Sequence, residues 1–399
     1  MEKNKLIEIF KTALKEEMLE TNVEHNIDLL GSEYKPDLVI YPQSVDDLIK
    51  AVRLANEHKI PLYPIGSSSK FKSAVAPFTG GVLISTKRLN KIIEYRPDNM
   101  SIEVEAGMKI NELQEALAKD NIFYPVEDRF TNATIGGQVA ANSYGRKKYM
   151  YKSARFYVMG LEFVSPQGEL VRVGGRTVKN VSGYDVSQLL TGSWGVLGII
   201  TKVTLRVRPI PQKRTQLEYI TEDFSKVTEV IDSILKEQIS LASLTFRKTD
   251  KKYLLQLELE GFVESLELQV NNLKDKYGFK DGSKSQIEVN NYSEAIISLP
   301  LDTYCQGLKE IEALKDSQGL IYQGNITNGL VELNSQLLNQ ELVNKITSVV
   351  NDLQGTLVYQ GQRLTKKERG TGYIKVLKNL KSVVDPHHIL IPQSLVLKE

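Results

Sequence analysis

The stretch from Lys179 to Thr201, KNVSGYDVSQLLTGSWGVLGIIT, constrains the fold of this chain more than any other part of it. It carries Gly183, Gly192, Gly195 and Gly198 among small hydroxyl residues and then runs into a strand-like segment that ends at Arg208. Glycine lacks the Cβ atom that would block a tight turn or a close approach to the backbone. A single stretch of this kind is typical of an ordinary loop before a strand, and it also suits a backbone against which something large lies.

Two further stretches of the same character lie upstream, Pro64–Lys70 (PIGSSSK) and Thr134–Gly145 (TIGGQVAANSYG). The first follows a short apolar run and presents successive backbone N–H groups and hydroxyls, which suit the oxygens of a diphosphate, and Lys70 adds a positive charge. Neither the G-x-x-x-x-G-K-[ST] pattern nor a G-x-G-x-x-G that opens a helix is present, so a nucleotide triphosphatase or a Rossmann nicotinamide site is not indicated. Three such stretches in one domain indicate a shared ligand.

Charge and hydropathy exclude several classes of protein. The formal net charge of +2 comes from 51 basic and 49 acidic residues, which leaves no field of one sign for nucleic acid. No apolar run reaches the ~18 residues of a transmembrane helix, and the N-terminus carries charges where a signal peptide has its apolar region. We therefore expect a cytoplasmic protein, and a length of 399 residues favours two domains.

The chain has one cysteine, Cys305. A single thiol excludes an internal disulfide and argues against an iron–sulfur cluster held by this chain alone, because such clusters normally need four thiolates. Any electrons handled by the chain must enter or leave through another carrier.

Hydrophobic periodicity predicts a mixed order of helices and strands. An accessory helix is expected over residues 6–19, and Ser44-x-x-Asp47 caps a second amphipathic helix. Pro166-Gln167-Gly168 is typical of a hairpin turn between two strands. The expected strands of the first half are 38–41, 60–64, 81–85, 100–105, 157–164 and 169–173, with a further helix over 110–117.

Beyond Pro211 the glycine-rich character disappears, and helical and strand patterns alternate. Helices are expected over 227–234, 266–273 and 342–353, and strands over 255–259 and 356–360. Residues 255–260 alternate leucine with polar residues, as in a half-buried strand. The predicted organisation is an N-terminal helical segment (1–35), a glycine-rich domain (36–213), a second α+β domain (214–371) and a C-terminal return segment (372–399).

In their order and spacing, the three glycine-rich stretches resemble the FAD-binding domain of the vanillyl-alcohol oxidase flavoprotein superfamily. Within it the likeness is to glycolate oxidase and D-lactate dehydrogenase chains, particularly the FAD-binding E subunit of glycolate oxidase. The match covers about residues 36–211, and Val384–Pro392 (VDPHHILIP) resembles the closing D-P-x-x-I-x-x-P segment of the family. The resemblance implies an α+β fold: a two-part FAD-binding domain of PCMH type and a second α+β cap domain, which in the family covers the flavin ring and holds the substrate.

The resemblance also implies the residues that bind FAD. The first stretch would hold the pyrophosphate, the second would line the flavin and its ribityl chain, and Gly198 and Ile200 would meet the adenosine end. Serines stand where some members carry a histidine that binds FAD covalently, so noncovalent FAD is expected. Ser68 stands near the usual second glycine of the first loop. The predicted FAD-binding residues are Ile65, Gly66, Ser67, Ser68, Ser69, Lys70, Pro125, Thr134, Gly136, Gly137, Ala140, Gly198 and Ile200.

Oxidation of a 2-hydroxy acid needs, besides a hydride acceptor, a base for the hydroxyl proton and a cation for the carboxylate. The relatives that work alone usually carry a metal-binding histidine cluster in the second half, whereas this chain has no histidine between His58 and His387. No metal site is therefore expected, and the E subunit fits better than the catalytic D subunit.

The candidates for catalysis each have an alternative that is purely structural. Arg247 and Arg146 are expected more readily as solvated residues, at a strand edge and in a basic patch respectively. The histidine pair can simply form hydrogen bonds in the terminal turn. The candidates are Arg247, His387, His388, Lys179 and Tyr184, with Arg146 after them.

Two functions remain open. In the first, the chain is a flavin-carrying subunit, for electron transfer or as a scaffold, of a glycolate oxidase-type complex whose related catalytic flavoprotein and iron–sulfur subunit are separate chains. Such a complex could attach peripherally to the inner face of the membrane. In the second, the chain is a free-standing FAD-dependent dehydrogenase of D-lactate or glycolate that uses a dye or quinone-type acceptor.

Overall fold

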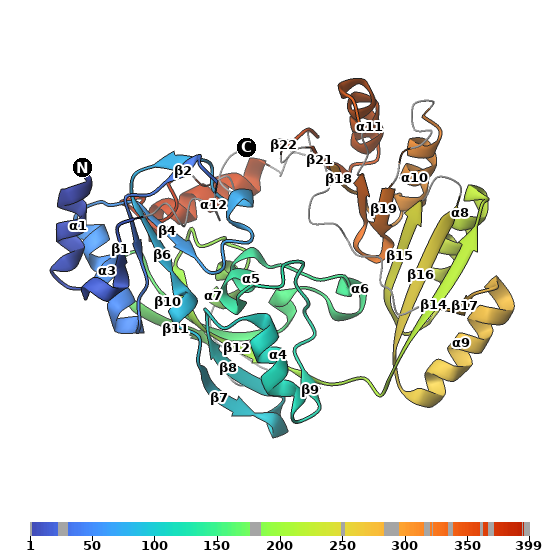
Figure 1. Cartoon of the computed structure of the whole chain (residues 1–399), viewed down its shortest axis with the longest axis horizontal. Helices are drawn as coiled ribbons and strands as arrows, with labels where there is room; N and C mark the ends of the chain where they lie inside the picture. Colours follow the sequence, from blue (N-terminus) through green and yellow to red (C-terminus); the bar gives the residue numbers. More distant parts are fainter. Residues whose placement is uncertain are drawn as a thin grey trace. The chain divides into compact units, whose positions relative to one another are not determined.

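The computed structural model describes residues 2–22, 31–175, 185–248, 252–282, 295–314, 320, 322–333, 338–359, 362–365, 371–392 and 394. The chain forms two compact units, whose elements are drawn in Figure 1. Unit 1 comprises Met1–Tyr144, Ser153–Pro209 and Arg369–Glu399, and unit 2 comprises Gly145–Lys152 and Ile210–Glu368. The sequence pattern does not indicate that residues 145–152, which follow the second glycine-rich stretch directly, belong to unit 2.

A four-stranded sheet in the order β1-β3-β6-β4 begins unit 1. Its last three strands are parallel and are buried on both faces, which explains their continuous apolar sequences. Helices α1 (Lys3–Lys11) and α3 (Val45–Glu57) lie side by side and share a core cluster with one face of this sheet (Figure 1). The strands are β1 (Leu19–Glu20), β3 (Leu38–Ile40), β4 (Leu62–Ile65) and β6 (Val82–Ser85).

The two helices test the sequence prediction differently. The capped helix is confirmed, because the Ser44 hydroxyl accepts a hydrogen bond from the Asp47 N–H at 3.2 Å at the start of α3. The helix expected over residues 6–19 is wrong in length, since α1 ends at Lys11. There the Thr12 hydroxyl donates to the Ile9 carbonyl, a local hydrogen bond of the kind that competes with regular helix. Leu14 lies beyond the helix and is nevertheless buried.

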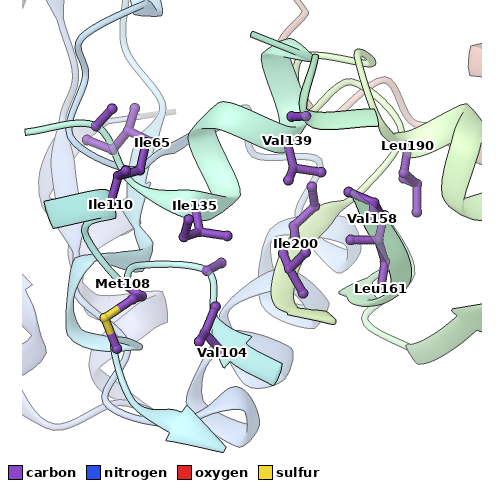
Figure 2. Packing of buried hydrophobic residues seen from close by; sticks show 14 of the residues in the cluster. Ile65, Val104, Met108, Ile110, Ile135, Val139, Val158, Leu161, Leu190 and Ile200 are labelled. Atoms are coloured by element: carbon purple, nitrogen blue, oxygen red, sulfur yellow. The ribbon is translucent and has the colours of Figure 1, made fainter. Parts of the chain in front are cut away.

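A second, antiparallel sheet completes unit 1 in the order β11-β10-β12-β8-β7. The predicted hairpin is confirmed, because β10 pairs with β11. Helix α5 (Ile135–Ala141) packs on this sheet, and Figure 2 shows Ile135 and Val139 among the buried side chains that include Ile200 and Val158. The remaining elements of unit 1 are β2 (Tyr34–Lys35), β5 (Phe78–Thr79), β7 (Ile92–Arg96), β8 (Ser101–Glu105), β9 (Ile122–Phe123), β10 (Val158–Val164), β11 (Leu170–Gly174), β12 (Ile199–Arg206), β13 (Arg208–Pro209), α4 (Ile110–Ala118), α7 (Val186–Leu190) and α12 (Thr371–Val384).

Unit 2 is built on a nine-stranded sheet in the order β17-β14-β16-β15-β19-β20-β18-β21-β22. Helices α8 and α9 pack on β14 and β16, and α11 packs on β21 and α10 (Figure 1). The elements are α6 (Lys148–Tyr151), α8 (Phe224–Ile234), α9 (Val263–Tyr277), α10 (Tyr304–Glu312), α11 (Gln340–Asp352), β14 (Lys213–Thr221), β15 (Leu241–Lys248), β16 (Tyr253–Gly261), β17 (Lys280–Asp281), β18 (Ala295–Ser298), β19 (Tyr322–Asn325), β20 (Leu330–Leu333), β21 (Thr356–Tyr359) and β22 (Gln362–Arg363).

The alternating pattern of β16 is confirmed in its apolar half, because its leucines at 255, 257 and 259 enter the core of unit 2. Two polar residues between and after them, Gln256 and Glu260, are buried as well, so the strand is not half-exposed. Glu260 is paired with Lys147 of the 145–152 segment, which accounts for its tolerance of burial.

No helix in the part of the chain that the structure describes is long and apolar enough to cross a lipid bilayer.

Candidate functional site

A cavity in unit 1 brings together all three glycine-rich stretches. It is lined by residues 64–71 and 74–75 from the first stretch and its continuation, by Thr134, Gly137 and residues 140–141 from the second, and by Trp194 from the third. Ile391 of the C-terminal segment completes the lining. Segments separated by more than 300 positions in the sequence therefore share one wall.

The first two stretches touch where Gly66 meets Thr134. A Cβ atom at Gly66 would overlap the Thr134 hydroxyl, so only glycine allows this approach. Thr134 also begins α5, where its hydroxyl accepts a hydrogen bond from the Gly137 N–H at 3.3 Å. A Cβ atom added at Gly137 would lie 3.1 Å from this hydroxyl and would meet no other atom within 4 Å outside its chain neighbours and the local helix backbone, so the backbone is open where it lines the cavity.

The second and third stretches are joined by backbone hydrogen bonds. The N–H of Gly192 donates to the Val139 carbonyl at 3.1 Å, and the N–H of Trp194 donates to the Ala140 carbonyl at 2.8 Å. These bonds hold Trp194 next to Ala140 on the cavity wall.

Ser68 adopts the backbone conformation that glycine favours. Its φ angle is +63°, in the left-handed region, although no glycine stands there. A left-handed conformation costs a non-glycine residue about 1–2 kcal/mol. The loop therefore retains a turn suited to glycine at the position where the family usually carries one.

Lys70 lies on the cavity wall, but its charge is compensated within the protein. Its Nζ lies 2.8 and 2.7 Å from the two carboxylate oxygens of Asp128, whose side chain is only 2% exposed. Asp128 also accepts hydrogen bonds from the Phe130 N–H, the Ser143 hydroxyl and the Gln138 amide. This carboxylate therefore links the first glycine-rich stretch to the second.

Four of the predicted FAD-binding residues lie outside the cavity lining. Pro125 and Ile200 are buried, and an added Cβ atom at Gly136 would lie 2.6 Å from the Ala106 Cβ. At Gly198 an added Cβ would lie 2.6 Å from the Phe163 ring. Glycine is thus required at both positions by packing against neighbouring strands and loops, while the other predicted residues line the cavity.

None of the catalytic candidates that the structure describes is among the residues that line this cavity. His387 and His388 are exposed in the turn after α12, where the His387 Nδ1 lies 3.2 Å from the Asn56 Oδ1. Lys179 and Tyr184 lie outside the described residues.

The structure corrects the expectation that the two arginine candidates are solvated. Arg247 is not at a strand edge: β15 is flanked by β16 and β19, and its guanidinium donates to the Gln323 amide oxygen at 3.1 and 3.3 Å. Arg146 is not a solvated member of a basic patch, because its Nη2 lies 3.2 Å from a Glu258 oxygen and its side chain is 20% exposed. Both arginines find their partners on strands of unit 2 that are remote in sequence.

Trp194, Asp128 and Ile391 are parts of the site that the sequence prediction misses. Trp194 is the single tryptophan of the chain and lies between two glycines of the third stretch, which is a signal that could have been used. Asp128 and Ile391 have no comparable local signal, because their importance depends on contacts with remote segments.

Comparisons with known proteins connect this fold and cavity with FAD binding. Residues 36–174 match the family described as FAD binding domain. The structure is also similar to p-cresol methylhydroxylase, with a TM-score of 0.73 at 16% identity over 97% of this chain and 95% of that one. The chain thus carries an FAD-binding domain over residues 36–174, and its fold is similar to that of p-cresol methylhydroxylase.

The chain is also similar to several curated proteins. The chain is 32% identical to the glycolate oxidase subunit GlcD of Bacillus subtilis over 56% of this chain and 47% of the relative. It is 30% identical to a D-lactate dehydrogenase of Anaerostipes hadrus over 59% and 52%. These matches span about half the length of the relatives. A D-2-hydroxyglutarate dehydrogenase of Stutzerimonas stutzeri is 25% identical over 90% of both chains.

Proposed function

We propose that this chain is the FAD-binding subunit of a complex of the glycolate oxidase or D-lactate dehydrogenase type. It takes part in the oxidation of a small 2-hydroxy acid and passes the electrons to a partner protein. The observation that carries the proposal is the meeting of three glycine-rich stretches in one cavity within a domain that matches the FAD-binding family. Bound FAD supplies the two-electron acceptor for a reaction in which the hydroxy acid loses a hydride and a proton and becomes a 2-oxo acid.

The residues of the cavity fit FAD held without a covalent bond. Loop 66–70 offers small side chains and hydroxyls suited to diphosphate oxygens, and the second stretch offers a backbone open at Gly137. Among the described residues, none that lines the cavity is a histidine, cysteine or tyrosine, the side chains that could form a bond to the flavin. Denaturation with acid is expected to release all yellow colour into the supernatant. Flavin that stays with the precipitated protein would contradict noncovalent binding.

The subunit assignment is supported by what the second half of the chain lacks. It has no histidine between His58 and His387, and one cysteine in all. No group of three or more His, Cys, Asp or Glu side chains in the described ranges is placed to hold a metal ion. We therefore propose that a related catalytic flavoprotein and an iron–sulfur subunit complete the reaction, in the cytoplasm or at the inner face of the membrane.

A free-standing dehydrogenase of a D-2-hydroxy acid is the alternative. It is favoured by the similarity, over 90% of both chains, to a protein named D-2-hydroxyglutarate dehydrogenase. Arg247 would then be the cation for the substrate carboxylate, since the Gln323 oxygen uses only two of its five N–H donors.

The deciding experiment starts from an absorption spectrum of the purified chain, followed by anaerobic addition of glycolate, D-lactate or L-lactate. A subunit is expected to show a flavin spectrum and at best weak dye reduction, and to become more active when it is co-expressed and co-purified with the partner chains. Robust turnover by the chain alone, near a typical enzyme rate of about 10 per second, would refute the subunit assignment and support the free-standing enzyme.

A further inference from the structure

A buried ion pair that is distant from the glycine-rich stretches in the sequence connects the third of them to the C-terminal segment. Lys381, in the last turns of α12, and Asp385, just after it, have side chains that are 4% and 0% exposed. The Lys381 Nζ donates to the Asp385 carboxylate, to the Val196 carbonyl at 2.8 Å and to the Leu390 carbonyl at 2.7 Å. All three donors of the ammonium group are therefore used.

Asp385 is satisfied with equal completeness. Its two carboxylate oxygens accept the Ile389 N–H at 3.0 Å and the Leu390 N–H at 2.9 Å, in addition to the ammonium group. Burying two charges costs several kcal/mol per ion unless good geometry and hydrogen bonds compensate. A pair of apolar residues of similar volume often gives a protein that is equally stable or more stable. Stability alone thus explains this pair poorly, and what it connects is more informative.

The pair connects two segments that contribute residues to the cavity lining. Val196 belongs to the third glycine-rich stretch, and Leu390 precedes Ile391, which lines the cavity. The same segment pairs with β4, which leads into the first stretch: the Leu62 N–H donates to the Ile389 carbonyl at 2.7 Å, and the Ile391 N–H donates to the Leu62 carbonyl at 2.8 Å.

Ile391 itself shows that this segment is held in place. Its φ angle is +45°, which is unfavourable for a β-branched residue and persists only where surrounding contacts determine the conformation. Its side chain lies close to the third stretch, since a Cβ atom added at Gly195 would be 3.4 Å from the Ile391 Cδ1.

We infer that Lys381 and Asp385 are positioning residues of the FAD site, which hold the strained Ile391 against the cavity and fix the third glycine-rich stretch behind it. The C-terminal segment is then a part of the cofactor site. This inference rests on the proposed FAD site.

The test measures FAD affinity through the quenching of Trp194, the single tryptophan, on the cavity wall. In the double variant Lys381→Met/Asp385→Asn, no buried charge is left, and the asparagine oxygen can still accept one N–H. We expect it to bind FAD at least tenfold more weakly. Ile391→Ala should weaken binding similarly. The triple variant should lose little more, because both changes act through the same wall. The matched control is Lys378→Met, which is exposed on the same helix and should bind FAD as the wild type does.

Wild-type FAD affinity in the double variant, or fully additive losses in the triple variant, would overturn the inference. If the double variant does not fold, Ile391→Ala and Ile391→Gly still test the inference. Wild-type FAD affinity in both variants would mean that Ile391 does not contribute to FAD binding, which would overturn the inference. Failure of the wild-type chain to bind FAD would instead refute the proposed FAD site.

Discussion

Asp128 offers the sharpest test of how the cavity is held together. Its buried carboxylate receives two contacts from Lys70 and hydrogen bonds from the backbone of Phe130 and from Ser143 and Gln138. Asp128→Ala removes the carboxylate, so these donors lose the acceptor that they share. Breaking a buried pair costs about 3–5 kcal/mol when the remaining charge stays buried. Lys70 is 18% exposed and can turn toward solvent, so we expect the lower end, about 3 kcal/mol.

Urea unfolding of the FAD-free protein, followed by Trp194 fluorescence, measures this loss in unit 1. The midpoint should fall while the m-value stays unchanged, because the buried surface is the same. FAD affinity should fall too, since the carboxylate links the first stretch to the second. Asp98→Ala is the matched control: this aspartate is exposed, and the change should stay within about 0.5 kcal/mol. An Asp128→Ala midpoint equal to that of the control would refute the role assigned to this carboxylate.

Three further predictions follow from single residues. Ser68→Gly should stabilise unit 1 by up to about 1 kcal/mol, because glycine adopts the left-handed conformation without the cost that serine has. The greater flexibility of glycine in the unfolded chain offsets only part of this gain. A lower urea midpoint would contradict the prediction. Gly137→Val should abolish FAD retention while circular dichroism shows a folded chain, because the side chain enters the open side of the cavity; full flavin occupancy would show that the cradle is misplaced. Burial alone would raise the pKa of Glu162, but hydrogen bonds from Lys202, Thr201 and Arg172 lower it below 4.5. The ionised carboxylate therefore stabilises the fold above pH 4.5, and this contribution is lost as the pH falls through the folded-state pKa. Glu162→Gln should therefore lose less stability than the wild type on acidification below pH 4.5, and parallel acid unfolding curves would argue against it.

Local patterns predict much of the secondary structure. The Ser44 cap, the hairpin around Gly168 and the leucine alternation of β16 each depend on neighbours within a few residues, and each is found in the structure. The helix expected over residues 6–19 is too long: α1 ends at Lys11, next to a hydrogen bond from the Thr12 hydroxyl to the Ile9 carbonyl. Periodicity reports which face is apolar and cannot report where a side chain redirects the backbone.

Burial of charge is where sequence reasoning misses most. Arg146 and Arg247 look like surface residues when only their neighbours are considered. Their partners, Glu258 and Gln323, come from strands that are more than 70 positions away along the chain. An arginine is buried when the hydrogen bonds that remote groups supply offset the free energy of desolvating its guanidinium group. No local sequence pattern contains those remote groups.

The sequence by itself determined that three backbone segments of this chain must come close to something, because glycine and small hydroxyl residues are placed where a Cβ atom would obstruct. It also carried the resemblance that identifies FAD. Only the tertiary structure decided which of these glycines face the cavity, as Gly137 does, and which are needed for packing, as Gly198 is. It alone placed Ile391 on the cavity wall and Lys381 behind it. The physical reason is that the backbone conformations open to a glycine depend on that residue alone. A cavity, in contrast, is formed by surfaces that meet only when distant segments fold together.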